Sequence, residues 1–356
     1  MMGHVPFAER GGRVRGVLDL ATGCYPRFLF GGALGDLLPA FHFHDVTRAW
    51  LEPRLQFLVE NGYRTVSCDE IARLVSGGVS PGPRRVALTF DDAWESVHSV
   101  ALPLLKQYGL TAILFAIPGR IANAAGASPF VTWAQLREIH ASGLCDVQSH
   151  TRSHAMIFSD AEAVDFVTPT FGDEPFLNRP VISTDGRIDA IGPDALGTPL
   201  FTRRSRMSDA RRYFPDAAVA DRCREHVLRN GGAAFFSRNG WRRELHAIVE
   251  ADGAERFETD ADRATAIRDE LAAGRALLNE RLKTDTVKHV AMPWGVSGTV
   301  ARQALAATGH ELAFAQRPFL RYAIRAGDDR FQLMRLNGRF LTCLPGRGRR
   351  WFLTAG

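Results

Sequence analysis

The sequence predicts an α/β fold in which one barrel of strands and helices carries a large insertion. Short apolar runs alternate with helical patterns over residues 38–158, and the alternation resumes over 262–340. Strands separated by helices form parallel βαβ units, and the likeness of the two stretches argues against two separate domains. The length of 356 residues fits one barrel of about 250 residues with about 100 more. The expected organisation is an N-terminal extension at 1–37, a barrel at 38–340 interrupted by an insertion at 159–261, and a C-terminal tail at 341–356.

The first half of the barrel is predicted from four strands and the helices between them. The strands are expected at Ala40–His44, Arg85–Phe90, Ala112–Ile117 and Leu144–Ser149. Two of these runs, RVALTF and AILFAI, are continuously apolar, which is typical of strands buried on both faces. The helices are expected at Arg48–Asn61, Asp69–Val75, Ser96–Tyr108 and Thr132–Ser142. Asp69 is expected as an N-cap, Pro103 as a kink, and Thr132 with Gln135 as a capping box.

The insertion contains many turn formers and few clean strand patterns. Helical patterns occur near Asp216–Arg229 and Gly240–Glu250, and the stretch RRSRMSDARR at 203–212 is expected to be a solvated basic patch. Beyond the insertion, the alternation predicts helices at Asp262–Leu282 and Thr299–Ala307 and strands at Val287–Met292, Leu312–Ala315 and Gln332–Leu336. Because loops set specificity in barrels, we expect the insertion to form a lid or a contact between identical subunits.

Composition narrows the class of protein. The net charge is +5, but only three of the 44 basic residues are lysines and 39 acids oppose them. This balance does not form the basic stripe of a nucleic-acid-binding protein, so no nucleic-acid partner is expected. The five cysteines are scattered and form no C-x-x-C pair, which excludes a zinc ribbon and a disulfide framework. With no apolar run of signal-peptide or membrane-span length, we expect a cytoplasmic protein.

Two adjacent acids, Asp91 and Asp92, stand at the carboxyl end of the most strand-like run. Buried carboxylates need a cation or hydrogen bonds, and catalytic groups of α/β barrels lie at this end of the strands. The alternative is that the acids only cap a helix that begins after them.

Two histidines, His150 and His154, directly follow the strand at Leu144–Ser149. At a spacing of four residues both rings can reach one ion, although such a spacing also arises by chance among 11 histidines. With one aspartate they form a three-ligand set that leaves positions open for water, which is typical of a catalytic metal.

These two motifs, Thr89-Phe90-Asp91-Asp92 and Ser149-His150-Thr151-x-Ser153-His154, resemble the metal-site motifs of the polysaccharide deacetylase superfamily (carbohydrate esterase family 4). The later run VAMPWG resembles the family's third motif, an aromatic-Pro-aromatic-Gly turn. The resemblance covers about 40–158 and 262–340. It implies a distorted (β/α)7 barrel with a large insertion.

The resemblance also implies roles for particular residues. Asp92, His150 and His154 would hold a divalent metal, expected to be Zn²⁺, with Co²⁺, Ni²⁺ or Mn²⁺ as alternatives. Asp91 would be the general base for metal-bound water, which attacks an acetamide carbonyl. Pro293 and Trp294 of the third motif would form a wall for the substrate.

The general acid is expected near the N-terminus. A late Leu-x-His motif, common in the family, is missing, but permuted members carry an N-terminal aromatic-His-x-Val motif whose histidine is the acid. Phe43-His44-Asp45-Val46 matches this pattern, so His44 is the expected acid and His42, on the same pleat face, a weaker candidate. The alternative is that His44 only caps the following helix.

The sequence departs from the family pattern at two places. Ala93 replaces the glycine that usually follows the paired aspartates, and the third motif lacks the arginine that often orients the base. Arg152 or an arginine of the insertion is a candidate for that role. Trp94 and Trp133 are expected to be packing residues.

The leading hypothesis is a metal-dependent hydrolase that removes an N-acetyl or N-formyl group from an amino sugar or glycan. Hydrolysis of a non-sugar small-molecule amide on the same fold is the alternative chemistry. A non-catalytic carbohydrate-binding relative is the third possibility, and the complete set Asp91, Asp92, His150 and His154 argues against it.

Overall fold

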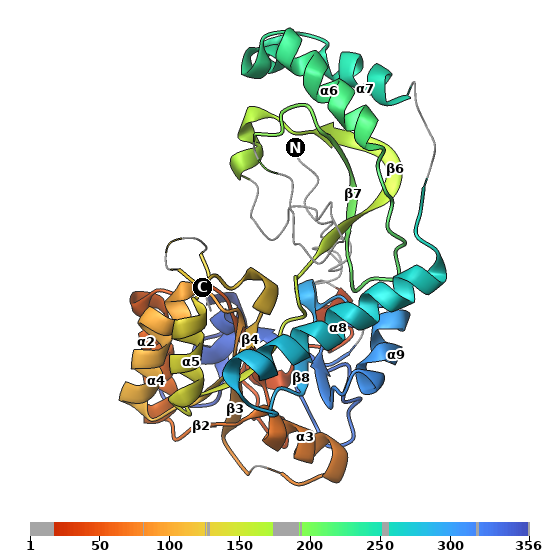
Figure 1. Ribbon diagram of the computed structural model, residues 1–356. Coiled ribbons are helices and arrows are strands. Elements are labelled where there is room, and N and C mark those ends of the chain that lie inside the picture. The colour runs from red at the N-terminus through yellow and green to blue at the C-terminus, as the bar shows by residue number, and fades with distance from the viewer. Residues whose placement is uncertain are drawn as a thin grey trace. The chain divides into compact units, whose positions relative to one another are not determined.

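A computed structural model describes residues 18–80, 82–124, 126, 129–173, 192, 194–250, 256–317 and 320–354. Within these residues the chain divides into two compact units (Figure 1). The barrel unit comprises residues 18–153, Arg268–Ser297 and 302–354, and the insertion unit comprises His154–Ile267 and Gly298–Ala301. The first 17 residues of the expected extension lie outside the described residues.

The barrel unit is built on a parallel sheet whose main path has seven strands, in the order β10-β1-β3-β4-β5-β8-β9, with β2 paired to β3 as an eighth. The strands are β1 (Ala40–Phe43), β2 (Arg64–Thr65), β3 (Arg85–Asp92), β4 (Ala112–Ala116), β5 (Cys145–Ser149), β8 (His289–Ala291), β9 (Leu312–Phe314) and β10 (Leu336–Asn337). Leu333 forms a parallel bridge with Phe314 of β9, and Leu336 pairs with Phe41 of β1. The segment 333–337 therefore contacts both ends of the path, and the predicted distorted (β/α)7 barrel is confirmed.

Helices follow the strands as the alternation predicts: α2 (Arg48–Glu60), α3 (Cys68–Gly77), α4 (Leu102–Tyr108), α5 (Trp133–Ala141), α8 (Asp260–Leu282) and α9 (Thr299–Ala307). The capping box of Thr132 and Gln135 is present at α5. The expected cap at Asp69 is wrong, because Ser67 caps α3 in a capping box with Glu70. Pro103 follows a π-helical turn at Val97–Ala101 that continues directly into α4, so the helix is irregular in the turn before Pro103, next to the expected kink.

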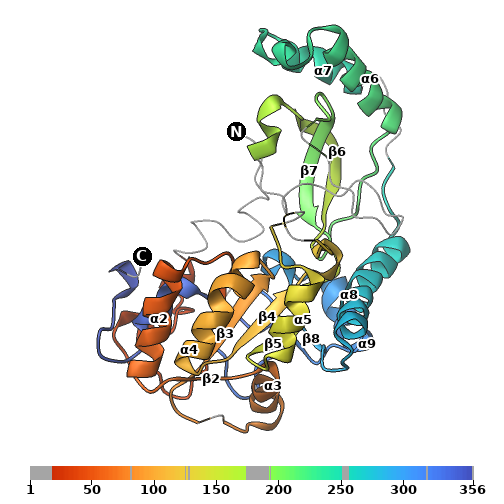
Figure 2. The same ribbon diagram turned by 60° about the vertical axis from the view of Figure 1, so that its left-hand side comes forward.

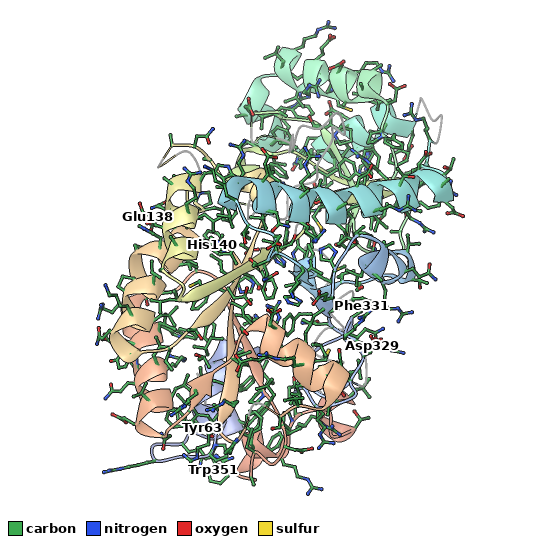
Figure 3. All side chains as sticks on the ribbon, turned by 60° about the horizontal axis from the view of Figure 1, so that its bottom comes forward. Tyr63, Glu138, His140, Asp329, Phe331 and Trp351 are labelled. Carbon is green, nitrogen blue, oxygen red and sulfur yellow. The ribbon has the colours of Figure 1, made fainter. Side chains whose placement is uncertain are left out.

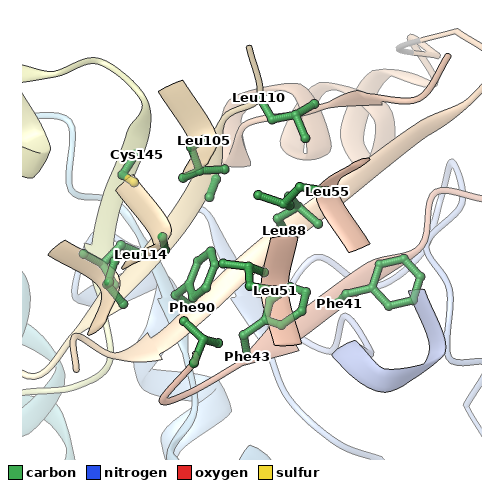
Figure 4. Close-up of a cluster of buried hydrophobic side chains, with 14 of the residues drawn as sticks. Phe41, Phe43, Leu51, Leu55, Leu88, Phe90, Leu105, Leu110, Leu114 and Cys145 are labelled. Carbon is green, nitrogen blue, oxygen red and sulfur yellow. The ribbon is translucent and has the colours of Figure 1, made fainter. Parts of the chain in front are cut away.

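One of two hydrophobic clusters of the barrel unit lies between the sheet and α2, α4 and α5, which lie together on one side of the strands (Figure 2). Phe43 and Phe90, from neighbouring strands, stack at 5.1 Å between centroids, beside Leu51 and Leu55 of α2 (Figure 4). Gly338 packs against Phe43 so closely that a Cβ would lie 2.3 Å from the ring.

Residues from both ends of the chain complete this core. Phe28 and Leu341 are fully buried in the same cluster. The Arg349 guanidinium donates hydrogen bonds to the carbonyls of Phe28, Gly31 and Gly32. The Tyr63 hydroxyl donates to the Pro345 carbonyl (2.8 Å), and Figure 3 shows Tyr63 and Trp351 at the same edge of this unit.

The insertion unit contains a two-stranded antiparallel sheet and two main helices. The sheet pairs β6 (Met156–Phe166) with β7 (Pro199–Ser205), and the helices are α6 (Ala217–Arg229), capped by Asp216, and α7 (Trp241–Glu250). The described residues of this unit contain few strands, as expected, but the sequence did not locate β6 and β7. The pattern was hidden because polar residues fill the middle of β6 and bulges shift its register.

The arginine-rich stretch 203–212 is not a solvated patch. Arg206 and Arg212 are both 6% exposed. The Arg206 guanidinium donates three bonds of 2.9–3.0 Å to the Glu258 carboxylate, which also accepts from the Arg212 backbone N–H at 2.7 Å. A buried ion pair thus fixes this segment inside its unit.

All five cysteines lie buried as free thiols. Among the described helices, none has an apolar stretch long enough to span a bilayer.

Candidate active site

The parallel register brings the predicted motifs to one edge of the sheet. Asp92 is level with Ala116, Ala116 with Ser149, and Ser149 with Val290, so the ends of β3, β4, β5 and β8 form a row. The side chains that follow these strands share the carboxyl edge of the barrel, where the catalytic groups of this architecture lie.

The backbone along this edge adopts the left-handed conformation at several non-glycine residues. The φ angles are 70° at Asp92, 59° at Ala93, 63° at Thr151, 53° at His154 and 53° at Trp294. Such conformations cost about 1–3 kcal/mol each and persist where surrounding structure holds them, often at functional sites. At Ala93, glycine would adopt the same conformation without strain.

Asp92, His150 and His154 form a buried group whose ligand atoms all lie within 4.8 Å of one another. Their residues are only 3%, 2% and 4% exposed. His150 Nδ1 lies 2.7 Å from the Ala291 carbonyl oxygen, an acceptor, so Nδ1 carries a hydrogen and donates it. In the neutral ring the lone pair of Nε2 then faces Asp92 Oδ1 at 3.4 Å.

Either a proton on Nε2 or a metal ion between the ring and the carboxylate would satisfy both atoms. Tetrahedral zinc with bonds of about 2.1 Å separates its ligand atoms by about 3.4 Å. The donor set of one carboxylate and two imidazoles, with His150 oriented by a backbone carbonyl, therefore fits a divalent metal.

The charges around His150 also favour a positive charge at this place. Burial opposes its charged form, but the Asp91 and Asp92 charges and a hydrogen bond from the ring to Asp92 outweigh burial and raise the pKa of His150. The place between the carboxylates thus favours positive charge, and a metal ion would have to displace a proton to bind.

Asp91 is held by Arg335. Arg335 Nη1 donates to Asp91 Oδ1 (2.6 Å) and Nη2 to Oδ2 (2.8 Å), while Nη1 also donates to Thr89 Oγ1 (2.9 Å). The guanidinium carbon lies 5.5 Å and 5.4 Å from the ring centroids of Phe115 and Phe314. Burial alone would raise the pKa of Asp91, but the charges of Arg335 and His150 and the Arg335 hydrogen bonds hold it well below its usual range.

Sequence reasoning missed Arg335 and named Arg152 or an arginine of the insertion for the role of orienting Asp91. Arg335 comes from the segment 333–337 that closes the barrel, 244 residues from Asp91 in sequence. The available signal was a lone arginine between buried apolar residues in a predicted strand, because such a charge needs a buried partner.

His44 lies at the end of β1, beside Asp91. Its Nε2 is 3.9 Å from Asp91 Oδ2, and its side chain is 51% exposed. The His42 ring lies edge-on to the His44 ring at 5.5 Å. His44 also lines a pocket of about 350 Å³ together with Asp45, Trp50 and Asn337.

Pro293 and Trp294 form a single turn, Pro293–Gly295, directly after β8. Pro293 is buried and Trp294 half-buried. Gly295 has φ 73°, and a Cβ there would lie 2.6 Å from Gln316. The turn stands on the edge that carries His150, since the Ala291 carbonyl at the end of β8 accepts from that ring.

The two tryptophans that were expected to be packing residues differ. Trp133 is 6% exposed and belongs to the core. For Trp94 the expectation is incomplete, because its indole Nε1 donates to Asp92 Oδ2 at 3.0 Å. Trp94 therefore helps to orient one carboxylate of the three-residue group.

Two further groups of possible ligands occur among the described residues, and both already hold a cation from the chain. In the group of His42, His44 and Asp91, the Arg335 fork takes both carboxylate oxygens. In the group of Asp69, His289 and Glu311, the Lys288 ammonium lies 3.1 Å from Asp69 and 3.3 Å from Glu311. Asp92, His150 and His154 are the group whose geometry favours a metal.

Comparison with known proteins agrees with this geometry. The polysaccharide deacetylase family model matches residues 78–168, which include both motifs. The chain is 27% identical over 125 residues to YxkH of Bacillus subtilis (strain 168), whose name places it among the polysaccharide deacetylases. It is 30% identical over 131 residues to the poly-beta-1,6-N-acetyl-D-glucosamine N-deacetylase of Escherichia coli (strain K12). Each match covers 33% of this chain and respectively 43% and 20% of the relative.

Two solved structures share the fold. The BpsB deacetylase domain of Bordetella bronchiseptica aligns with a TM-score of 0.54 at 18% identity, over 85% of this chain and 96% of that one. IcaB of Ammonifex degensii aligns with a TM-score of 0.51 at 20% identity, over 85% and 92%. The chain is thus an α/β-barrel protein whose described residues include a buried Asp-His-His group. More particularly, the family-model match and the named relatives relate residues 78–168 of this chain to the polysaccharide deacetylase superfamily.

Proposed function

We propose that this protein is a metal-dependent deacetylase that removes N-acetyl groups from an amino sugar or glycan. The observation that carries the proposal is the buried group of Asp92, His150 and His154, with His150 Nε2 3.4 Å from Asp92 Oδ1, beside an Asp91 held ionised by Arg335. Asp92, His150 and His154 would hold the ion. When bound, such an ion polarises a carbonyl and lowers the pKa of water to about 7.

In this proposal Asp91 is the general base. Arg335 fixes both oxygens of Asp91 and keeps the carboxylate charged at neutral pH. A carboxylate of such low pKa is a weak base towards ordinary water, so its contribution depends on an acidified water nearby. The bidentate hold also restricts the direction from which Asp91 accepts a proton.

His44 is the proposed general acid for the leaving amine. Its ring is half-exposed, its Nε2 lies 3.9 Å from Asp91 Oδ2, and it lines the pocket, whose lining does not include Asp91. The remaining lining suits a sugar: Trp50 supplies an apolar ring, and Thr47, Asp45 and Asn337 supply hydrogen-bonding groups. Pro293 and Trp294 are proposed as a further wall of the substrate site. The bounds 159–261 of the insertion, and its role as a lid or as a contact between identical subunits, stay predictions.

N-acetylglucosamine is the proposed amino sugar, because the Escherichia coli relative is named for a poly-N-acetylglucosamine substrate. The test is acetate release from β-1,6-linked N-acetylglucosamine oligomers by protein loaded with Zn²⁺, compared with a panel of small amides. Wild type should release acetate and hold one ion per chain, and Asp92→Ala and His150→Ala should lose both. A wild type that binds no divalent ion, or that cleaves only non-sugar amides, would overturn the proposal.

A further inference from the structure

The loop that carries the two histidines has backbone conformations that its own residues do not favour. Between His150 and His154, Thr151 has φ 63° and His154 itself has φ 53°. The left-handed region is unfavourable for a β-branched residue such as threonine. Contacts from elsewhere in the chain must therefore hold this loop.

Those contacts come largely from Glu270 on α8, 117 residues beyond Ser153. Glu270 Oε1 accepts hydrogen bonds from the Ser153 N–H (2.5 Å), the Ser153 hydroxyl (2.6 Å) and the Thr151 hydroxyl (3.2 Å). The Glu270 backbone carbonyl also accepts from the Arg152 N–H at 3.2 Å. The Glu270 side chain thus binds Thr151 and Ser153 and its backbone binds Arg152, so this one residue contacts all three residues between the histidines.

The helix can approach the loop because it carries a glycine one turn later. A Cβ on Gly274 would lie 2.7 Å from the Arg152 nitrogen and 2.8 Å from the Thr151 carbonyl carbon. The opposite side of the loop is bound as well: the Gly119 N–H donates to the Arg152 carbonyl (2.8 Å), and Arg120 Nε donates to the Ser153 carbonyl (3.1 Å). The loop is therefore held from both sides, by the Glu270 carboxyl group on one and by the Arg120 guanidinium on the other.

We propose that Glu270 is a positioning residue that holds the His150–His154 loop in the geometry of a metal site and so sets the affinity for a divalent ion. The inference rests on the metal site of the proposed function but not on any substrate. Glu270 touches no reacting atom in this account. It acts through the two histidines whose connecting residues it binds.

The experiment compares Glu270→Ala and Glu270→Gln with Asp269→Asn, an exposed acid next to Glu270 on the same helix. Metal-stripped proteins are titrated with Zn²⁺ in competition with a chromophoric chelator, and the Tm of each metal-free protein is recorded. Removing an outer partner of metal ligands weakens binding by about 10–100-fold, which is the loss expected for Glu270→Ala. Glu270→Gln keeps an acceptor without its charge and should weaken binding by about fivefold, whereas Asp269→Asn should bind as wild type does.

Saturating Zn²⁺ should restore activity to the Glu270 variants, because no reacting group has been removed. A wild-type Zn²⁺ affinity in Glu270→Ala would overturn the proposal even if its Tm falls, since a purely structural residue would behave in that way. If Glu270→Ala fails to fold, an equal affinity of Glu270→Gln and Asp269→Asn overturns it. A wild type that binds Zn²⁺ but releases no acetate would refute only the proposed function.

Discussion

Replacing Arg335 by methionine tests whether the buried pair with Asp91 is the central electrostatic contact of the site. The side chains are 10% and 5% exposed and joined by two charge-assisted bonds of 2.6 Å and 2.8 Å. Methionine keeps much of the apolar volume between Phe115 and Phe314 but leaves Asp91 buried without its partner. Breaking one side of such a pair costs about 3–5 kcal/mol, so we expect a loss of that size in the free energy of unfolding.

The assay is urea unfolding of the metal-free protein at pH 7, followed by circular dichroism. Asp91→Asn should also cost several kcal/mol, because it leaves Arg335 unpaired. The double variant leaves neither charge, so its loss should fall short of the sum of the single losses by at least about 2 kcal/mol. Arg330→Met, at an exposed arginine five residues earlier, is the control and should stay within about 0.5 kcal/mol of wild type.

The same variant has a signature in the pH profile. Without Arg335 the burial of Asp91 is less opposed, so its pKa moves up from its depressed value. Activity that needs ionised Asp91 is then lost at a higher pH as the solution is acidified, and the acid limb of kcat/KM shifts upward. Strictly additive unfolding losses, or an unmoved acid limb, would refute this reading of the pair.

Three further outcomes follow from the structure. His44→Gln should lower kcat by about 10²–10⁴-fold with Zn²⁺ affinity unchanged, as acetate release and metal titration would show; an unaltered kcat excludes His44 as the acid. Burial, together with the charges of Arg275 and His289, lowers the pKa of His310 to about 4, below its ordinary 6.5, so its neutral form stabilises the fold above pH 6.5 and this contribution disappears as the pH falls towards 4. Up to about 3 kcal/mol should be lost there in wild type but not in His310→Gln, and parallel unfolding curves against pH would contradict this. Gly338→Ala places a methyl group against Phe43 and should lower the free energy of unfolding by about 1–3 kcal/mol; a thermal melt as high as that of wild type would show that the contact relaxes freely.

The parts of the fold that the sequence predicts are those encoded by neighbouring residues. The run RVALTF forms β3 because its apolar residues leave no polar face, and Thr132 with Gln135 begins α5 because the pattern needs only four residues. The strand β6 was missed since its centre is polar and it pairs with a strand, β7, that is distant in the sequence: Met156 pairs with Ser205, and Phe166 with Pro199.

In the candidate site, too, the residues in short local motifs could be predicted from the sequence, and those from distant segments could not. Asp91, Asp92, His150 and His154 stand in two short motifs, and parallel pairing of β3, β4 and β5 brings them together. Arg335 and Glu270 reach these motifs from 244 and 117 residues away. Neither belongs to a local pattern, because their partners are defined only when the barrel closes.

A crystal structure of the Zn²⁺-loaded protein, with anomalous data at the zinc edge, would show directly which residues hold the ion. We expect one strong anomalous peak bonded to Asp92, His150 and His154, with Asp91 outside the coordination shell and still held by Arg335. A peak at Asp69, His289 and Glu311 instead, or Zn²⁺ bound by Asp91 in place of Asp92, would contradict this expectation.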